Sequence, residues 1–302
     1  MELYSSSSSF AGVERGYEDS LYVVLGAPFD STSSFRQGQR FAPSRIREAS
    51  INIEGNGFYA RSMWIDHEPI YDAGDLSLPP GDVVEALARI RRVISGIVRD
   101  GRVPVTIGGE HTVTLGILQG LRDAGVKPCV IVLDAHYDLR SEYLGVEYSH
   151  ATVFRRALDK GLADMVVYAG VRAYDREEDS YARDSGLVYV IYSWEAQKLG
   201  PVNVAARIKS WTSQCTRIYL SIDIDALDPA YAPGAANPEP GGLTFAEAAR
   251  IIYEVADERI VGLDLVEVSP PHDCHDITSI TAAKLLQEAI LARSAHARSG
   301  RR

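Results

Sequence analysis

Ionisable side chains occupy every second position in the segment VIVLDAHYDL, residues 130–139. Asp134, His136 and Asp138 follow an apolar run that is typical of a buried strand. Residues two apart in a strand point to the same side, so these three groups would converge on one patch beside an apolar core. Such convergence is costly unless a counter-charge compensates it.

Two further segments carry groups of the same kind. His111 lies in GGEHT (108–112), and Asp223 and Asp225 lie in SIDIDALDP (221–229), again two residues apart. Four carboxylates in one cleft would repel one another and would mostly be forced to take up protons. Two divalent cations would supply the missing charge. An oxygen-rich set with two imidazoles suits manganese better than zinc, which favours Cys and His ligands.

A pair of metal ions predicts a class of chemistry. Two ions roughly 3.5–4 Å apart can share bridging carboxylates and a bridging water, and they lower the pKa of that water so that hydroxide is available near neutral pH. The implied reaction is metal-assisted hydrolysis. Each motif alone could be a solvated strand end or a turn, as we interpret Asp228 before Pro229. The three motifs together, each after an apolar run, favour the metal site.

The elements that must position these groups are short apolar runs separated by amphipathic segments of helix length. This alternation predicts an α/β fold around a largely parallel sheet, in which ligands bind at the carboxyl ends of the strands. We expect strands at 21–27, 102–109, 128–136, 165–172, 186–192, 217–225 and 259–268, with a weaker one at 68–75. We expect helices at 82–99, 112–124, 149–160, 203–213, 244–257 and 278–292.

The composition is that of a globular chain, with 302 residues, 46% hydrophobic and 24% charged, and a net charge of -10. The negative charge argues against nucleic acid or an anionic membrane as a partner. No apolar run approaches the roughly 20 residues that cross a bilayer, and the start MELYSSSSSF lacks a secretory pattern, so we expect a cytoplasmic protein. One domain, residues 1–302, is the simplest organisation, with mobile ends at about 1–15 and 294–302.

The three cysteines, Cys129, Cys215 and Cys274, are widely spaced and form no CxxC pair. A disulfide framework is therefore not expected, and we interpret Cys129 as a core residue of its strand. The segment PHDCHD (271–276) crowds two histidines and a cysteine too closely for the usual zinc spacing. We expect it to be a polar loop at the rim of the cleft.

The motifs GGEHT, DAHYD and SIDIDALDP, in this order, resemble the three signatures of the ureohydrolases, the arginase and agmatinase family. The similarity runs from GAPFDSTSSFRQGQRFAPSRIREAS (26–50) to LDLVEVSPPHD (263–273). It implies a three-layer α/β/α sandwich with an eight-stranded, mainly parallel sheet. It also implies a homo-oligomer such as a trimer or hexamer.

The resemblance further implies two Mn²⁺ ions per subunit, with Asp134 and Asp223 bridging them. One ion would be held by His111, Asp134, Asp138 and Asp223, and the other by Asp134, His136, Asp223 and Asp225. The metal-bridging hydroxide would attack the guanidinium carbon of a small cationic guanidino substrate, and urea would be released.

Three residues acquire catalytic roles from the same resemblance. Asp138 would pass a proton to the leaving amine. His150, in YSHATVF, would contact the substrate and serve as a proton shuttle, a role that suits a side chain with a near-neutral pKa. Glu267, in LDLVEVSP, would bind the planar guanidinium, whose paired N–H donors a carboxylate accepts side by side.

The substrate is predicted from departures from the arginase pattern. Arginases usually carry Asn where this chain has Arg140, and the loop at 142–157 looks more like the agmatinase pattern, so we expect agmatine, giving putrescine and urea. Asp175 falls where arginases place an acidic residue for the amino group of the substrate, and it could bind agmatine's distal amine. Arg140 could instead favour a carboxylate tail. Arginine, guanidinobutyrate and guanidinopropionate therefore stay open as substrates.

Two other classes of protein are open alternatives. A single-zinc deacylase on a related sheet would act on acylated amines, but the complete set of six ligands speaks against it. A non-catalytic, metal-stabilised subunit could keep the ligands for stability but would need neither His150 nor Glu267.

Overall fold

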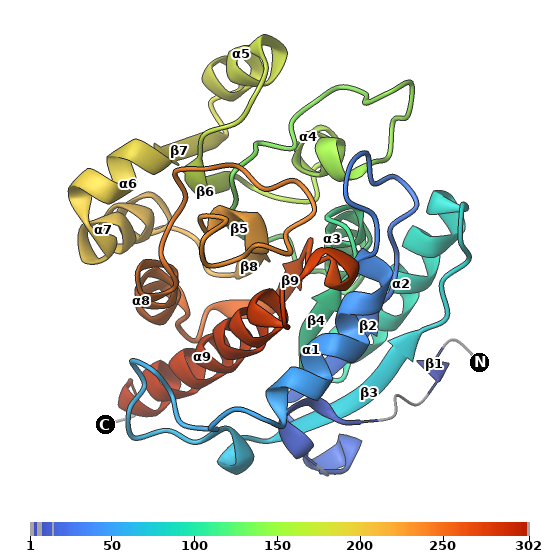
Figure 1. Ribbon diagram of the computed structural model, residues 1–302, viewed down its shortest axis with the longest axis vertical. Helices are drawn as coiled ribbons and strands as arrows, with labels where there is room; N and C mark the ends of the chain where they lie inside the picture. The colour runs from blue at the N-terminus through green and yellow to red at the C-terminus, as the bar shows by residue number, and fades with distance from the viewer. Residues whose placement is uncertain (1–2, 5–7, 14, 301–302) are drawn as a thin grey trace.

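The computed structural model describes residues 3–4, 8–13 and 15–300, and its strands form one sheet (Figure 1). The strands are β1 (Leu3–Tyr4), β2 (Tyr22–Ala27), β3 (Ile70–Leu76), β4 (Val103–Gly108), β5 (Cys129–Leu133), β6 (Val166–Val171), β7 (Val188–Tyr192), β8 (Ile218–Asp223) and β9 (Ile260–Val266). Their order is β1-β3-β2-β4-β9-β8-β5-β6-β7. Strands β2 to β9 are parallel, and the two-residue β1 is antiparallel to β3. All eight predicted strands are confirmed.

The helices alternate with the strands, as the sequence predicts. They are α1 (Ala42–Ser50), α2 (Val83–Arg99), α3 (Thr112–Asp123), α4 (Val153–Asp159), α5 (Arg176–Asp184), α6 (Ser193–Leu199), α7 (Pro201–Trp211), α8 (Phe245–Val255) and α9 (Ile277–Ser299). The six predicted helices are present, but α1, α5 and α6 were missed. They are short, and α5, REEDSYARD, has almost no apolar residues to show a period. Within the described ranges, none of the helices combines the length and apolarity that a bilayer crossing requires.

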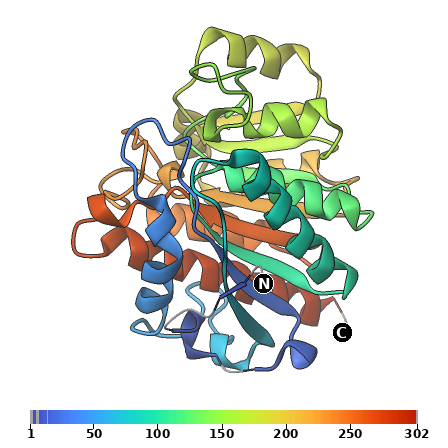
Figure 2. The ribbon, with the colours of Figure 1, turned by 90° about the vertical axis from the view of Figure 1, so that its right-hand side faces the viewer.

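The sheet lies between two layers of helices, which confirms the three-layer sandwich. Alternate residues of each strand face opposite layers. Val24 of β2 belongs to the core cluster of α1, α7, α8 and α9, whereas Val23 and Leu25 belong to the cluster of α2, α3 and α4. Figure 2 shows the sheet with the blue α1 and red α9 on one side and the teal and green helices on the other. Burial on both faces explains why the strands are continuous apolar runs.

The topology brings the polar motifs together. Strands β4, β9, β8 and β5 are consecutive in the sheet and parallel, so their carboxyl ends lie at one edge. Leu133 is in register with Ile222, and Asp223 with Val266. The residues that follow these strands are therefore level with one another, at the edge where ligands bind in α/β sheets.

The structure describes part of each end that the sequence predicts to be mobile, and there it shows regular structure and contacts. Helix α9 continues to Ser299, because polar residues of its last turns find partners: Ser294 hydrogen-bonds the Tyr22 hydroxyl at 2.7 Å, and Arg298 pairs with Glu68 at 2.8 Å. At the other end, Phe10 is fully buried. Most of the serine run, residues 5–7, lies outside the described residues, as do 301–302.

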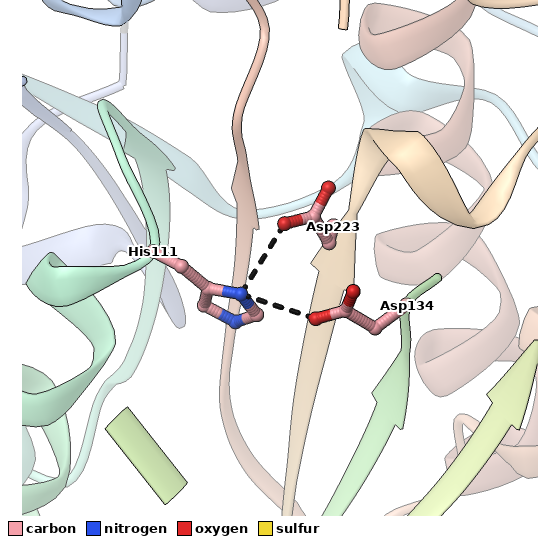
Figure 3. A group of neighbouring side chains, drawn as sticks. All are labelled: His111, Asp134 and Asp223. Atoms are coloured by element: carbon pink, nitrogen blue, oxygen red, sulfur yellow. Dashed lines mark ion pairs between the residues drawn. The ribbon is translucent and has the colours of Figure 1, made fainter. Parts of the chain in front are cut away.

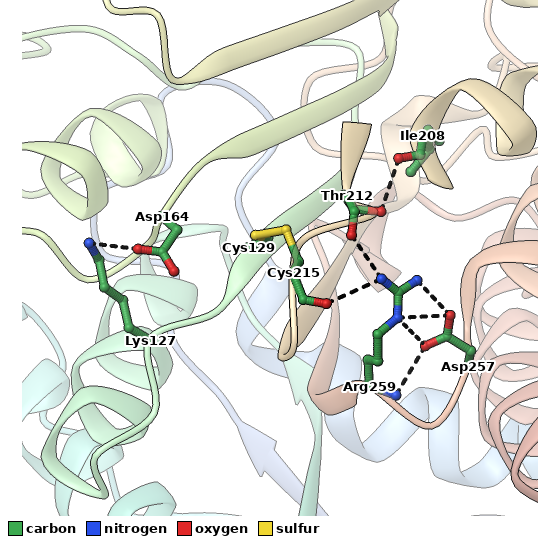
Figure 4. Close-up of a disulfide and its surroundings, with 8 residues drawn as sticks. All are labelled: Lys127, Cys129, Asp164, Ile208, Thr212, Cys215, Asp257 and Arg259. Carbon is green, nitrogen blue, oxygen red and sulfur yellow. Dashed lines mark hydrogen bonds and ion pairs between the residues drawn. A yellow bond between two sulfur atoms is a disulfide. The ribbon is translucent and has the colours of Figure 1, made fainter. Parts of the chain in front are cut away.

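The prediction that the cysteines are unpaired was also wrong. Cys129 and Cys215 form a disulfide with their Cα atoms 6.1 Å apart (Figure 4). Cys129 begins β5, and its register partner in β8 is Ile218, three residues after Cys215, so the fold brings the two sulfurs together. Their separation of 86 residues gave no sign of this in the sequence. Cys274 is free and exposed.

Removal of the disulfide should lower the stability of the fold. In the chain-entropy model, a cross-link that closes a loop of this length contributes about 4.6 kcal/mol to the free energy of unfolding. We expect Cys215→Ser to lower the unfolding midpoint in urea, and dithiothreitol to have no further effect on that variant. The matched control, Cys274→Ser, should unfold like the parent chain. Equal midpoints for Cys215→Ser and the parent under non-reducing conditions would show that the bond contributes nothing.

Candidate active site

The first group of candidate ligands gathers around His111, which lies between β4 and α3. Its Nδ1 atom is 3.2 Å from Asp134 Oδ2, 3.0 Å from Asp138 Oδ2 and 3.2 Å from Asp223 Oδ2. Figure 3 shows Asp134 and Asp223 reaching this nitrogen from the ends of two strands, β5 and β8. One nitrogen and three carboxylate oxygens thus surround one point.

The second group gathers around His136. Its Nδ1 atom is 3.0 Å from Asp225 Oδ2 and 3.6 Å from Asp134 Oδ1. Asp134 therefore takes part in both groups, with Oδ2 directed to His111 and Oδ1 to His136. This is the arrangement of a carboxylate that can bridge two ions. The structure brings all six predicted ligands into these two groups.

A chain of hydrogen bonds fixes the tautomer of His111. The hydroxyl of Ser221 donates to Asp264 Oδ1 at 2.7 Å and lies 3.0 Å from His111 Nε2. Asp264 also accepts hydrogen bonds from Thr114 and Tyr219, each at 2.6 Å. Because the single proton of Ser221 goes to Asp264, its oxygen must accept the Nε2–H of His111. The lone pair of a neutral His111 is then on Nδ1 and faces the carboxylates.

This arrangement needs a cation. His111 Nδ1 and Asp134 Oδ2 are buried and form no hydrogen bond of acceptable geometry with the described residues. Burial alone would lower the pKa of His111, but the close contacts with the carboxylates of Asp134, Asp138 and Asp223 raise it well above its usual value. Burial and the charge of Asp134 raise the pKa of Asp138 to about 7. Without a metal the cluster therefore holds extra protons, which divalent ions would replace, so the donor set fits two metal ions.

A cleft of about 610 Å³ lies beside this cluster. Its lining includes four of the six candidate ligands and most of the other predicted site residues. The lining residues are Ser34, Phe35, His136, Asp138, Arg140, Tyr143, His150, Ala151, Arg172, Ala173, Tyr174, Glu178, Asp223, Asp225, Asn237, Pro238, Glu239 and Glu267. Asp175 is absent from this lining.

Two cleft residues have an unusual backbone. Asp138 has φ 51° and Glu267 has φ 67°, values in the left-handed region that non-glycine residues rarely adopt. Glu267 is held there by hydrogen bonds that it accepts from the His111 N–H at 2.6 Å and from Gln39 Nε2 at 3.0 Å. Burial, followed by the charge of Glu110, raises the pKa of Glu267 to about 8. Backbone strain at residues that line a cleft is a sign of function.

His150 contacts hydroxyl groups through both of its ring nitrogens. Nδ1 is 3.4 Å from Thr32 Oγ1, and Nε2 is 3.3 Å from Ser34 Oγ. The ring packs edge-on against Tyr143 with the ring centres 5.4 Å apart. Burial, followed by the neighbouring histidines of the metal groups, lowers the pKa of His150 to about 4. This histidine is therefore neutral near pH 7.

Arg140 and Asp175 neutralise each other. Arg140 Nη1 is 2.6 Å from Asp175 Oδ2, and Asp175 Oδ1 caps α5 by accepting the N–H of Glu178 at 2.9 Å. Both oxygens of Asp175 are thus engaged, and the side chain lies outside the cleft lining. Its expected contact with a substrate amine would require the pair to break. The sequence did not indicate that these two residues meet.

Two cleft residues were missed by the sequence analysis. Arg172 donates to the carbonyl oxygens of Asp225 at 2.6 Å and Glu239 at 2.8 Å, so it ties the loop at 234–242 to the metal ligands. Glu239 also lines the cleft; its carboxylate has no hydrogen bond or ion pair with the described residues, but its charge acts on the Arg172 guanidinium. The available signal was an acidic residue within the proline- and glycine-containing segment GAANPEPGG (234–242).

The segment 271–276 is not part of either metal group. Cys274 is exposed, and its Sγ lies 3.2 Å from His275 Nδ1. Neither residue belongs to a group of potential metal ligands among the described residues.

Comparisons with known proteins agree with the motifs. Residues 20–292 match the Arginase family. The agmatinase of Halalkalibacterium halodurans is 36% identical, over 95% of this chain and 96% of that protein, and the proclavaminate amidinohydrolase of Streptomyces clavuligerus is 37% identical, over 91% and 88%. The crystal structure of the agmatine ureohydrolase of Thermoplasma volcanium superposes with a TM-score of 0.85 at 36% identity, covering 96% of this chain and 95% of that one.

Proposed function

Because the chain belongs to the arginase family, we propose that it is a binuclear manganese amidinohydrolase that converts agmatine and water to putrescine and urea. The observation that carries the proposal is the pair of ligand groups that share Asp134 beside a cleft lined by Glu267. A single-zinc deacylase would account for only one of these groups. A purely structural metal site would not explain the strained backbone of Glu267, because such strain is typical of residues that bind or react with a ligand.

The candidate site residues would have three roles: metal binding, binding of the guanidinium, and proton transfer. His111, Asp134, Asp138 and Asp223 would hold one ion, and Asp134, His136, Asp223 and Asp225 the other. When bound, the ions lower the pKa of a water and polarise the bond under attack. Glu267 accepts the paired N–H donors of the guanidinium and so fixes its plane. Asp138 would take a proton from the attacking water and pass it to the leaving amine, and His150, neutral and beside the cleft, would transfer a second proton between the cleft and solvent.

The charges of the cleft favour a cationic tail on the substrate. The charge of Arg140 is paired with Asp175, and the guanidinium of Arg172 is directed at backbone carbonyls. Neither arginine is free to bind a carboxylate tail. Glu239, in contrast, lines the cleft, and its carboxylate forms no hydrogen bond or ion pair with the described residues, although its charge acts on the Arg172 guanidinium. We therefore favour agmatine over guanidinobutyrate, guanidinopropionate and arginine.

A urea-release assay with manganese-loaded protein tests this proposal. Agmatine, arginine, guanidinobutyrate and guanidinopropionate are compared at equal concentration. We expect agmatine to give the highest kcat/KM. If one of the three carboxylate-tailed compounds is hydrolysed fastest, the proposed substrate is wrong while the reaction class stands. If none of the four releases urea, the proposed function is wrong.

Glu239→Gln should weaken the binding of agmatine. We expect KM for agmatine to rise about fivefold with little change in kcat, because a partly exposed ion pair is worth on the order of 1 kcal/mol. The KM for guanidinobutyrate should fall or stay the same. The matched control is Glu142→Gln, which removes the same charge from an exposed residue outside the cleft lining. An equal rise in KM for both substrates would argue against a contact with the amine.

We also propose the native metal ion, the oligomeric state and the cellular location of the enzyme. We propose manganese as the native ion on ligand type, and a homo-oligomer, a trimer or hexamer, on the family resemblance. We also propose the cytoplasm as its location. The disulfide between Cys129 and Cys215 is unusual for that location, because such bonds are rare in the cytosol. Metal analysis and light scattering of the purified protein test the first two parts.

A further inference from the structure

Glu110, the acidic residue of GGEHT, has no role in the function proposed above. It is fully buried and directs its carboxylate at the loop that follows β2. Oε2 accepts the backbone N–H of Thr32 at 2.8 Å, and Oε1 accepts the Thr32 hydroxyl at 2.6 Å. Ser33 adds a third hydrogen bond at 3.2 Å. A buried carboxylate that is satisfied in this way holds the loop firmly in one position.

Thr32 in turn holds His150. Its Oγ1 accepts the backbone N–H of His150 at 3.1 Å and lies 3.4 Å from Nδ1 of the ring. The other ring nitrogen, Nε2, contacts Ser34, which also lines the cleft. The three residues Glu110, Thr32 and His150 come from separate parts of the chain and form one hydrogen-bonded chain.

The direction of each hydrogen bond follows from the number of protons. A threonine hydroxyl has one proton, and the short bond to Glu110 uses it, so the contact of 3.1 Å with Thr112 Oγ1 can only be a hydrogen bond that Thr32 accepts. Toward His150, the oxygen of Thr32 can therefore only accept. The ring nitrogen that faces it, Nδ1, is stabilised when it carries the proton of the neutral imidazole. The lone pair of His150 is then on Nε2, the nitrogen on the side of Ser34.

We propose that Glu110 and Thr32 are a positioning pair for His150. They fix the place of its backbone and select the tautomer that leaves Nε2 free to take up and release a proton at the cleft. The inference rests on the proposed function, since it gives His150 the task of proton exchange. Thr32 and Glu110 are positioning residues: neither belongs to the cleft lining, and among the described residues no hydrogen bond joins their side chains to a candidate metal ligand.

Kinetics of Thr32 variants on agmatine, with manganese-loaded protein, test the pair. Thr32→Val keeps the shape and removes the hydroxyl, and we expect kcat to fall about 10- to 100-fold, because small misplacements of a catalytic group have effects of this size. KM and metal content should change little. Thr32→Ser keeps the hydroxyl and should restore kcat to within about threefold of the parent. The control Ser31→Ala removes a hydroxyl of the same loop that contacts Gly81, and it should behave like the parent.

A double-mutant cycle shows whether Thr32 acts through His150. In a His150→Asn background, we expect Thr32→Val to cause no further loss of kcat. Thr32→Ala is measured in the same two backgrounds, and melting temperatures show that each variant is folded. The inference is overturned if Thr32→Val is as active as Thr32→Ser, or if the Thr32→Val loss is the same in both backgrounds. A parent enzyme that releases no urea would instead refute the proposed function, and the inference with it.

Discussion

Asp134→Asn is expected to remove both metal ions and to abolish urea release. Asp134 is fully buried, and its two oxygens face different histidines, so an amide in its place cannot serve both groups. We expect kcat/KM to fall on the order of 1,000-fold or more. Substitution of a residue that only hydrogen-bonds to a metal ligand already lowers metal affinity or activity about 10- to 100-fold, and loss of a ligand should cost more. Metal content after dialysis, measured by mass spectrometry, should drop from two ions per chain to fewer than one.

Two further variants show whether the loss of both ions is specific to Asp134. His136→Ala removes a residue of the second group only, so it should lose one ion and retain the other. Asp164→Asn removes an exposed aspartate, which pairs with Lys127 far from the cleft lining, and it should keep both ions and full activity. Two tightly bound ions in Asp134→Asn would contradict the bridging role.

Glu267→Gln is expected to stop turnover while the metal content persists. The amide offers one acceptor in place of two and turns N–H donors toward the donors of the guanidinium. Because hydrogen bonds between charged groups contribute about 1.5–3 kcal/mol each, we expect kcat/KM for agmatine to fall about 100-fold or more. The measurement is steady-state urea release together with metal analysis of the same sample.

The local structure should tolerate this substitution. The amide oxygen of the new side chain can still accept the His111 N–H, and its nitrogen can donate to Gln39, whose Oε1 has no hydrogen-bond partner among the described residues. The matched control is Glu258→Gln, an exposed position, which should leave kcat and KM unchanged. A variant that retains most of its activity would show that Glu267 does not bind the guanidinium.

The strands and the residues that gather in the two candidate ligand groups could be predicted because their signals are local. A parallel strand that is buried on both faces is a continuous apolar run, and a ligand pair such as Asp223 and Asp225 keeps the two-residue spacing of a strand end. Helix α5 was missed because it covers little of the core. Its beginning is set by the capping box of Asp175 and Glu178, a pattern that was present in the sequence but was interpreted as part of the substrate site.

The contacts that were missed join segments far apart in the chain. Arg140 pairs with Asp175, and Thr32 lies between Glu110 and His150. Each side chain is unremarkable in its own segment, and only the order of the strands brings the partners together. The disulfide between β5 and the segment before β8 has the same cause. These contacts depend on which strands are neighbours in the sheet, and a single sequence does not show this. They determine the charge of the cleft and hold the side chain of His150 in place.

The dependence of urea release on bound manganese shows whether the reaction requires two metal ions per chain. Metal-free protein is titrated with Mn²⁺, and the initial rate of urea release from agmatine is measured at each metal content. The two groups that share Asp134 predict that activity rises to a plateau at two ions per chain, with putrescine and urea formed in equal amounts. Full activity with one ion would contradict the binuclear mechanism. No urea from agmatine with two ions bound would contradict the proposed reaction.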